Sequence, residues 1–529
     1  MSNYDDNRPV VEERYVPPVA EAVVEQRSFW SRFWWLLPLL ALLIAIPFIA
    51  RGCNRHEVTE PVTTLPATIE PTHPAETTPA PEAHGELIPG TNIEGPLEPV
   101  TITWMHNFTG SPGVEAWETV AREFEDAHPG VTVNVVSIQN EELRDTVLPN
   151  AFQGGNQPDL FQSWGGGELR EWANEGIVWD LTNVLAPSVH ALGGSAGNWT
   201  VDGHNYGLPY SLGPAGFWVN LNVLDRAGLV NNVTHDADGN VNGGTVNWPT
   251  TMDGLFEMWA TLKEHGETPV AVGGGSSWPA AWWYYYTASM ACSPAALTAA
   301  GVDHDFSDPC WVQAGEDLQN ILDQDAFNDG WAATDAQTGA TSASGLIAFS
   351  NAAMEWMGPW GGPVSSNLWH EQQGTSGPMP SFLAWFPAPP VAGAPGAGNI
   401  MASGDGFSVL NPARGSEARS EAAAALLAFI VSDDVQTRMS QLHTWADGLE
   451  PARALTAPPV APGAIAVLDD PIWLNQASAV NNATFSTIWL DTLVGQEIGT
   501  PMNAAIVAFM GGQGSPQGIV DAIKAAAGH

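Results

Sequence analysis

The residues of this chain that could do chemistry are aromatic and polar side chains set in glycine-rich turns. The segment QSWGGGELREW at 162–172 joins an expected strand to an expected helix, and its consecutive glycines let a backbone come close to another group. The chain carries 58 acidic and 16 basic residues, a formal net charge of −42. This charge repels anionic ligands, nucleic acids and anionic membrane surfaces. The turn is therefore expected to face an uncharged ligand rather than a phosphate.

Tryptophan is the most unusual component of the sequence, with 24 residues. Three of them recur at helical or alternating positions and are expected in the core: Trp104, Trp117 and Trp259. Four others stand in glycine- or proline-rich contexts, where loops display side chains: Trp164, Trp278, Trp360 and Trp445. Aromatic faces pack against the apolar C–H faces of sugars, while amides, hydroxyls and carboxylates bind the sugar hydroxyls. These four tryptophans are therefore candidate ligand contacts.

Signatures of catalysis and of metal binding are weak. GGSAG at 193–197 fits the nucleophile-elbow pattern, but no buried strand precedes it. The 13 histidines form no metal-binding spacing. HDADGNVNGG at 235–244 lacks the third acid and the final glutamate of a calcium loop, so a surface hairpin is expected there. We expect no catalytic residue, no metal and no cofactor, and hence a binding protein rather than an enzyme.

The elements that position these residues alternate between strands and helices. Strands are expected at 100–105 and 131–138, with a helix at 113–127 between them; a helix near 141–153 then leads to the strand LFQSW at 160–164. This order is typical of a parallel sheet covered on both faces, whose ligands lie beyond the carboxyl ends of the strands. The turns after the first and third strands, NFTG and SWGGG, are expected to face one cleft.

The N-terminal 99 residues have a different composition. A polar tail at 1–32 precedes an uncharged run at 33–50, which is long enough for a membrane anchor or signal segment. A stalk rich in Pro, Thr and Glu follows at 51–99. Cys53 stands in the poor lipoprotein box ARGC, so an uncleaved anchor is favoured over lipidation of Cys53, which stays open. The bulk of the chain would then lie outside the cell membrane, anchored to its outer face.

The two remaining cysteines, Cys292 and Cys310, lie in a polar stretch. In an exported protein they are expected to form a disulfide, although two separately buried thiols remain the alternative.

From Val100 to His529 the chain resembles the extracellular solute-binding proteins of bacterial ABC importers, in the carbohydrate-binding family 1 that is maltose-binding-protein-like. Segments that carry the resemblance occur in the family's order, among them ITWMHNFTG, PDLFQSWGGGEL, HNYGLPYSLGPAGFWVNLNVLDRAGL, AAMEWMGPWGG and SGDGFSVL. The resemblance implies an α/β fold of the periplasmic-binding-protein type II, with two lobes joined by a three-crossing hinge. Lobe 1 would comprise 100–211 plus about 391–447, and lobe 2 would comprise 212–390 plus about 450–529.

The same resemblance implies a site and partners. The expected crossings lie near 210–212, 387–398 and 447–452, and the expected ligand contacts are Asn107, Gln162, Ser163, Trp164, Trp278, Trp360, Asp405 and Trp445. The implied function is a monomeric receptor that binds a neutral sugar or oligosaccharide and delivers it to the transmembrane subunits of an ABC permease. An exported carbohydrate-active enzyme, with two carboxylates facing each other, and a binding protein for a non-sugar solute are the alternatives.

Overall fold

The computed structural model describes residues 86–109, 113–391, 393–442, 464–467 and 472–528. The predicted tail, the membrane segment at 33–50, Cys53 and Trp445 lie outside these residues. Within the described ranges, no helix has the length and apolar character needed to cross a membrane.

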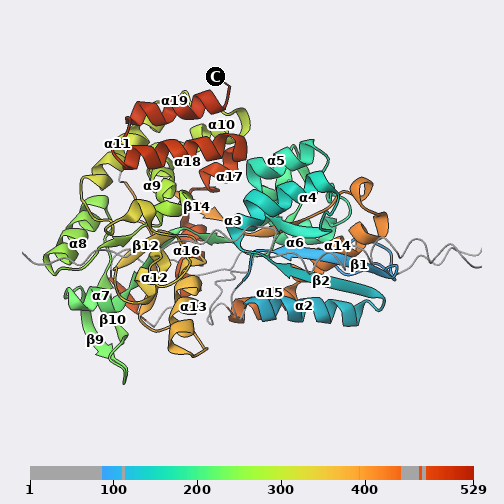
Figure 1. Cartoon of the computed structure of the whole chain (residues 1–529), viewed down its shortest axis with the longest axis horizontal. Helices are drawn as coiled ribbons and strands as arrows, with labels where there is room; N and C mark the ends of the chain where they lie inside the picture. Colours follow the sequence, from blue (N-terminus) through green and yellow to red (C-terminus); the bar gives the residue numbers. More distant parts are fainter. Residues whose placement is uncertain (1–85, 110–112, 392, 443–463, 468–471, 529) are drawn as a thin grey trace, which may run out of the picture. The chain divides into compact units, whose positions relative to one another are not determined.

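The first lobe is built on a five-stranded sheet in the order β2-β1-β3-β15-β6 (Figure 1). β1, β2 and β3 are parallel neighbours, whereas β15 runs antiparallel to both β3 and β6. The strands span Val100–His106 (β1), Val131–Ser137 (β2), Leu160–Ser163 (β3), Leu208–Pro209 (β6) and Gly406–Val409 (β15). The predicted parallel unit is confirmed, and chain segments from two distant parts of the sequence complete the sheet.

Helices cover both faces of this sheet because β1 is apolar on both sides. Ile102 and Trp104 are fully buried on the face packed by α2 and α14, while Met105 packs with Phe161 on the opposite face under α4 and α5. The helices of the lobe span Gly113–Ala127 (α2), Asn140–Glu142 (α3), Leu148–Gly154 (α4), Gly166–Asn174 (α5), Ala186–Leu192 (α6), Glu417–Ile430 (α14) and Asp433–Leu442 (α15), with a π-helical turn at Leu143–Val147 and short strands at Thr200–Val201 (β4) and His204–Asn205 (β5).

The folded unit begins earlier than the predicted end of the stalk at 99. Ile88, Ile93 and Leu97 are buried in the core shared with α2 and α14. The backbone N–H of Asn92 donates to the carbonyl of Val184 at 2.8 Å. Three apolar residues spaced irregularly among prolines have no helical or strand period, so composition alone placed them in the stalk.

The second lobe has a four-stranded sheet in the order β11-β12-β8-β13. Its strands span Gly216–Asn220 (β8), Val270–Ala271 (β11), Met354–Met357 (β12) and Leu383–Phe386 (β13). Its helices span Leu221–Arg226 (α7), Met252–Glu264 (α8), Trp278–Ala291 (α9), Pro294–Asp303 (α10), Cys310–Leu322 (α11), Ala343–Ala348 (α12), Gly361–Gln373 (α13), Ile472–Asn482 (α16), Leu490–Val494 (α17), Gln496–Met510 (α18) and Pro516–Ala526 (α19). The helix α9 is buried on all sides, since every residue after Trp278 in it is buried.

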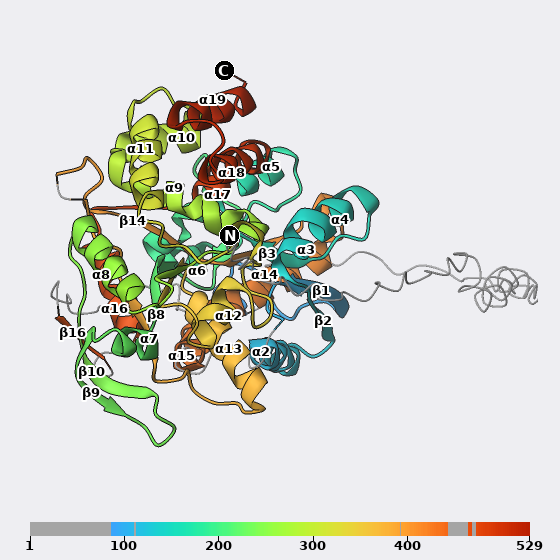
Figure 2. The ribbon, with the colours of Figure 1, turned by 60° about the vertical axis from the view of Figure 1, so that its left-hand side comes forward.

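Two features of the second lobe confirm predictions. The segment predicted as a surface hairpin forms the turn between the antiparallel strands β9 (Val230–His235) and β10 (Val241–Asn247), and β16 (Ala464–Val467) pairs with β10 on its other side (Figure 2). A disulfide joins Cys292, at the end of α9, to Cys310, at the start of α11.

Two chain crossings between the lobes lie side by side. β6 belongs to the first-lobe sheet, and β7 (Gly213–Pro214), four residues later, pairs with β14 (Asn399–Ser403), which in turn pairs with β17 (Phe485–Thr487). The first crossing therefore lies at 210–212, as predicted.

The second crossing lies at 404–405 rather than at 387–398. Met401 of β14 still belongs to the second-lobe core, and the chain rejoins the first-lobe sheet only at Gly406. The proline- and glycine-rich run that suggested an earlier crossing is a loop of the second lobe, where the N–H of Gly396 donates to the carbonyl of Met290 at 2.9 Å. The predicted third crossing at 447–452 lies outside the described residues.

Candidate ligand-binding site between the lobes

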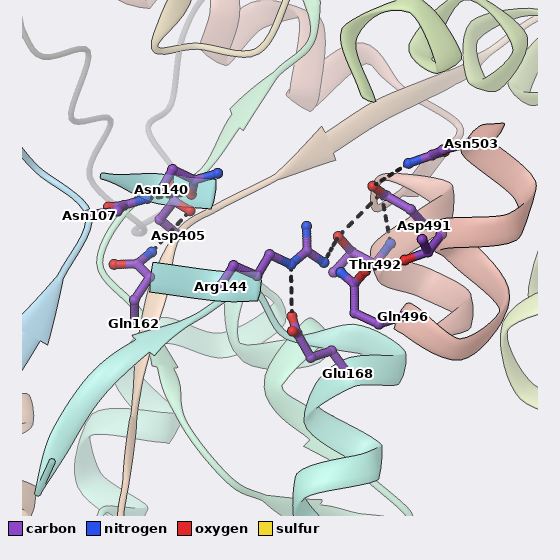
Figure 3. Close-up of polar contacts among 11 residues, drawn as sticks. Asn107, Asn140, Arg144, Gln162, Glu168, Asp405, Asp491, Thr492, Gln496 and Asn503 are labelled. Carbon is purple, nitrogen blue, oxygen red and sulfur yellow. Dashed lines mark hydrogen bonds and ion pairs between the residues drawn. The ribbon is translucent and has the colours of Figure 1, made fainter. Parts of the chain in front are cut away.

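Polar side chains gather where β1 and β3 end, at the edge predicted for a ligand. Asn107 directly follows β1, and its Nδ2 donates to Oδ1 of Asn140 in α3 at 3.0 Å (Figure 3). Gln162, near the end of β3, donates from Nε2 to Oδ1 of Asp405 at 3.2 Å. The carboxyl ends of parallel strands share one edge of a sheet, so both amides are held next to each other by the fold.

Asp405 is placed at this edge by the second crossing of the chain. Its backbone N–H donates to Oγ of Ser211 at 3.0 Å, and its carbonyl accepts from the N–H of Tyr210 at 2.9 Å. Burial raises the pKa of Asp405 to about 6, while the Gln162 amide and the charge of Arg144 act in the opposite direction. Asp405 is therefore a hydrogen-bond acceptor whose charge changes near neutral pH.

Arg144 lies at the centre of the site and comes from the π-helical turn at Leu143–Val147. Its Nε is 3.3 Å from Oε2 of Glu168, and its guanidinium lies over the ring of Trp164, 5.0 Å from the ring centroid. Burial opposes the charge on Arg144, but the carboxylates of Glu168 and Asp491 outweigh this effect and raise the pKa of the guanidinium. Arg144 is thus a fixed, compensated cation, as π-helical turns at functional sites often provide.

A cluster of four tryptophans lies on the second-lobe side of the site. Trp282 stacks on Trp489 with ring centroids 4.3 Å apart, and Trp360 packs edge-on against both. Trp278 lies 6.3 Å from Trp360, centroid to centroid, and donates from Nε1 to Oε1 of Glu141 in the first lobe at 3.1 Å. Trp278 and Trp360 are half-buried, whereas Trp282 and Trp489 are buried.

The structure places most of the predicted contact residues in this region. Gln162 and Ser163 are buried at the end of β3, and the hydroxyl of Ser163 has no hydrogen-bond partner within the described chain. Trp164 is 6 % exposed and already has Arg144 over its ring, so this face is occupied. Trp445 lies outside the described residues.

Sequence reasoning missed five residues of the region. They are Asn140, Glu141, Arg144, Trp282 and Trp489. The first three lie in a segment that reads as an ordinary helix, and Trp282 lies in an unbroken aromatic run, so no local pattern separates them from core or surface positions. Among the described residues, no group of three or more histidine, cysteine or acidic side chains could hold a metal ion.

The family of the chain follows from comparison with known proteins. Residues 110–437 match the bacterial extracellular solute-binding protein family, and the chain belongs to this family. Such a protein acts outside the cytoplasm, and the family consists of binding proteins.

Individual relatives are similar to the chain at low identity. An uncharacterised ABC transporter extracellular-binding protein of Pyrococcus horikoshii is 24 % identical over 180 residues, a match that spans 33 % of this chain and 37 % of that protein. A chitin oligosaccharide binding protein has a TM-score of 0.64 at 19 % identity, covering 81 % of this chain and 98 % of its own. The solute-binding protein RafE in complex with raffinose has a TM-score of 0.56 at 16 % identity, covering 80 % and 98 %. These likenesses show the two-lobed α/β fold.

Proposed function

We propose that this protein is a receptor that binds a neutral sugar or short oligosaccharide between its lobes and delivers it to an ABC permease. The observation that carries the proposal is the pairing of half-buried Trp278 and Trp360 in one lobe with the amide and carboxylate set around Asp405 in the other. Apolar ring faces suit the C–H faces of a sugar, and planar polar groups suit its hydroxyls.

The electrostatics of the region support an uncharged ligand. The charge of Arg144 is taken up by Glu168, and Asp491 lies close enough to contribute to the same balance. An anionic ligand would add to the carboxylates of a chain whose net charge is −42. The proteins of similar fold include receptors named for chitin oligosaccharide and raffinose, which agrees with a carbohydrate ligand.

The assignment within the site follows from exposure. Trp278 and Trp360 provide the ring faces, Asn107, Asn140 and Asp405 accept or donate to hydroxyls, and Gln162 and Ser163 lie behind them. Trp164 contributes through Arg144 rather than by stacking on the sugar, because the guanidinium covers its ring. Trp445 remains a proposed contact from the sequence alone.

The experiment that tests this function is a thermal-shift screen of neutral mono- and oligosaccharides, followed by titration calorimetry. A sugar at 100 times its dissociation constant adds about 2.7 kcal/mol of stability. Trp360→Ala should weaken binding by roughly thirtyfold, the loss typical of an aromatic anchor. The matched control is Trp259→Ala, a buried second-lobe tryptophan outside the cluster, which should lower the melting temperature and leave affinity unchanged.

Two results would contradict the proposal. Absence of stabilisation by any sugar would exclude the ligand class, and hydrolysis of an added oligosaccharide would show an enzyme, because a receptor returns its ligand unchanged.

We further propose that the uncharged run at 33–50 tethers the receptor to the outer face of the cell membrane. Cys53→Ser should then stay in the membrane fraction, because the anchor is the segment itself. Release of this variant into the soluble fraction would show that lipidation of Cys53 is the attachment.

A further inference from the structure

The glycine turn of the first lobe touches the second lobe directly. A Cβ added to Gly167 would lie 2.4 Å from the backbone N of Gly495 and 2.7 Å from the carbonyl carbon of Val494. A Cβ added to Gly166 would lie 2.6 Å from the carbonyl oxygen of Thr492. Both approaches are too close for any side chain, so these glycines allow the start of α5 to pack against the turn between α17 and α18.

A polar contact reinforces this backbone packing. The guanidinium of Arg144 donates from Nη2 to Oγ1 of Thr492 at 3.3 Å, crossing from the first lobe to the second (Figure 3). With its amide oxygen turned toward Arg144, Gln496 accepts from Nε at 2.8 Å and donates to Oγ1 of Thr500 at 3.1 Å. Thr492 is fully buried, so its hydroxyl has exchanged water for these protein partners.

The second-lobe side of the contact is itself held rigidly. The Asp491 carboxylate accepts from the N–H of Thr492 at 2.8 Å and from Nδ2 of Asn503, one turn or more along α18, at 3.3 Å. The hydroxyl of Tyr285 in α9 donates to Oδ1 of Asn503. The surface that meets the glycines is therefore fixed to the core of the second lobe.

We propose that these groups form an interlobe latch, consisting of Arg144, Gly166 and Gly167 in the first lobe and the segment 492–496 in the second. The latch joins the lobes without a ligand and sets the balance between joined and separated lobes. Because a ligand between the lobes is released only when they separate, the latch also lengthens the residence time of that ligand. This last consequence rests on the proposed function, whereas the latch itself does not.

Gly167→Ala is the sharpest test because its steric effect falls on the other lobe. The three atoms nearest to the added Cβ all belong to residues 493–495, and the position lies within α5, where alanine is favourable. Gly154→Ala is the matched control, since Gly154 is also helical, belongs to the first lobe and has nothing within 4 Å of its added Cβ. Thr492→Val approaches the latch from the second lobe by removing the hydroxyl that Arg144 binds.

Hydrogen exchange measured by mass spectrometry on the full, ligand-free chain reads the latch directly. Gly167→Ala and Thr492→Val should each speed exchange about fivefold or more in both facing segments, 143–148 and 488–496, with β2 unchanged. Gly154→Ala should behave like the wild type. Unchanged exchange in both latch variants would overturn the proposal, as would faster exchange spread evenly through β2. If Gly167→Ala fails to fold, Thr492→Val decides alone.

The measurement also separates this proposal from the proposed function. Exchange in the two segments is followed without any sugar, so the absence of a carbohydrate ligand would leave the result on the latch standing. A normal sugar affinity with unchanged exchange in both variants would instead sink the latch and leave the receptor.

Discussion

The indole N–H of Trp278 donates to the carboxylate of Glu141 over 3.1 Å, and the two residues belong to different lobes. This bond fixes the edge of a half-buried ring that otherwise contacts only other tryptophans of the cluster, Trp282 and Trp360. A ring held at its edge presents a defined face, which is the property that a sugar platform needs.

Trp278→Phe should therefore weaken sugar binding by about five- to tenfold, because the variant keeps an aromatic face and loses the hydrogen bond to Glu141. Titration calorimetry with the sugar found in the screen measures the effect. Trp331→Phe, a second-lobe tryptophan outside the cluster, serves as the control. Equal affinities for Trp278→Phe and the wild type would show that the bond to Glu141 does not orient the ring.

Sugar binding should depend on pH through Asp405. Its pKa is raised to about 6 in the ligand-free protein, mainly by burial, and the ionised carboxylate is the better acceptor for a sugar hydroxyl. Affinity is then highest above pH 6 and falls as the pH drops through this value. Asp405→Asn should bind more weakly at pH 8 and show a flat profile between pH 5 and pH 8. A wild-type affinity that is independent of pH would remove Asp405 from the site.

The latch should tighten as the pH falls through Glu171. Burial raises the pKa of Glu171 to about 7, with further contributions from Glu168, Glu497 and Glu175 and an opposing one from Arg144. Its carboxylate lies against Gly495 of the other lobe, so separation of the lobes would return this pKa toward the ordinary value of 4.5. A raised pKa in the joined state favours joining at low pH, and this advantage is lost as the pH rises through about 7.

Exchange of residues 488–496, corrected for its intrinsic pH dependence, should therefore be slower at pH 5.5 than at pH 8. Glu171→Gln should abolish the difference. Persistence of the difference in Glu171→Gln would assign the pH effect to another group.

Glu355 should limit stability at alkaline pH. It lies in β12 at 1 % exposure, and its carboxyl accepts from Oγ of Ser344 at 3.0 Å. Burial raises its pKa from 4.5 to about 8, so its contribution is most favourable below pH 4.5 and is lost as the pH rises through 8. Glu355→Gln keeps an acceptor for Ser344 and should raise the free energy of unfolding at pH 8 by about 2 kcal/mol. Urea denaturation at pH 5 and pH 8 tests this, and equal pH slopes for both proteins would contradict it.

Much of the framework could be predicted because local patterns determine it. The alternation in β1, the amphipathic α2 and the turn between β9 and β10 each carry their own signal in the sequence. The helix expected over 420–442 is instead two helices, α14 and α15, with a break at 431–432. Residue type alone gave no reason to end the first helix there.

The site could be predicted only where a turn marks it. Asn107, Gln162 and Asp405 follow or end strands, so the edge of the sheet brings them together. Trp489 reaches the cluster through a chain segment that returns to the second lobe after a long excursion, and Arg144 points across to the other lobe from a helical stretch. Contacts of this kind depend on how two lobes meet, and no periodicity within one segment encodes them.

The glycine turn shows how a correct observation led to a wrong partner. Consecutive glycines at 165–167 do mark a close approach of backbone, as expected. The approaching group at Gly166 and Gly167 is the backbone of the second lobe, rather than the neutral ligand that the composition suggested.

The pairing of the two crossings places Asp405 on the axle of the molecule. The strand ends on either side of it are bonded to the neighbouring crossing, where the N–H groups of Tyr210 and Ser211 both donate to its carbonyl, at 2.9 and 3.2 Å. When two rigid arms swing about such an axle, points on the arms travel far and points on the axle hardly move. A solute held by Asp405 would keep this one contact throughout the swing, so its first grip on the protein and its last would be made by the same carboxylate.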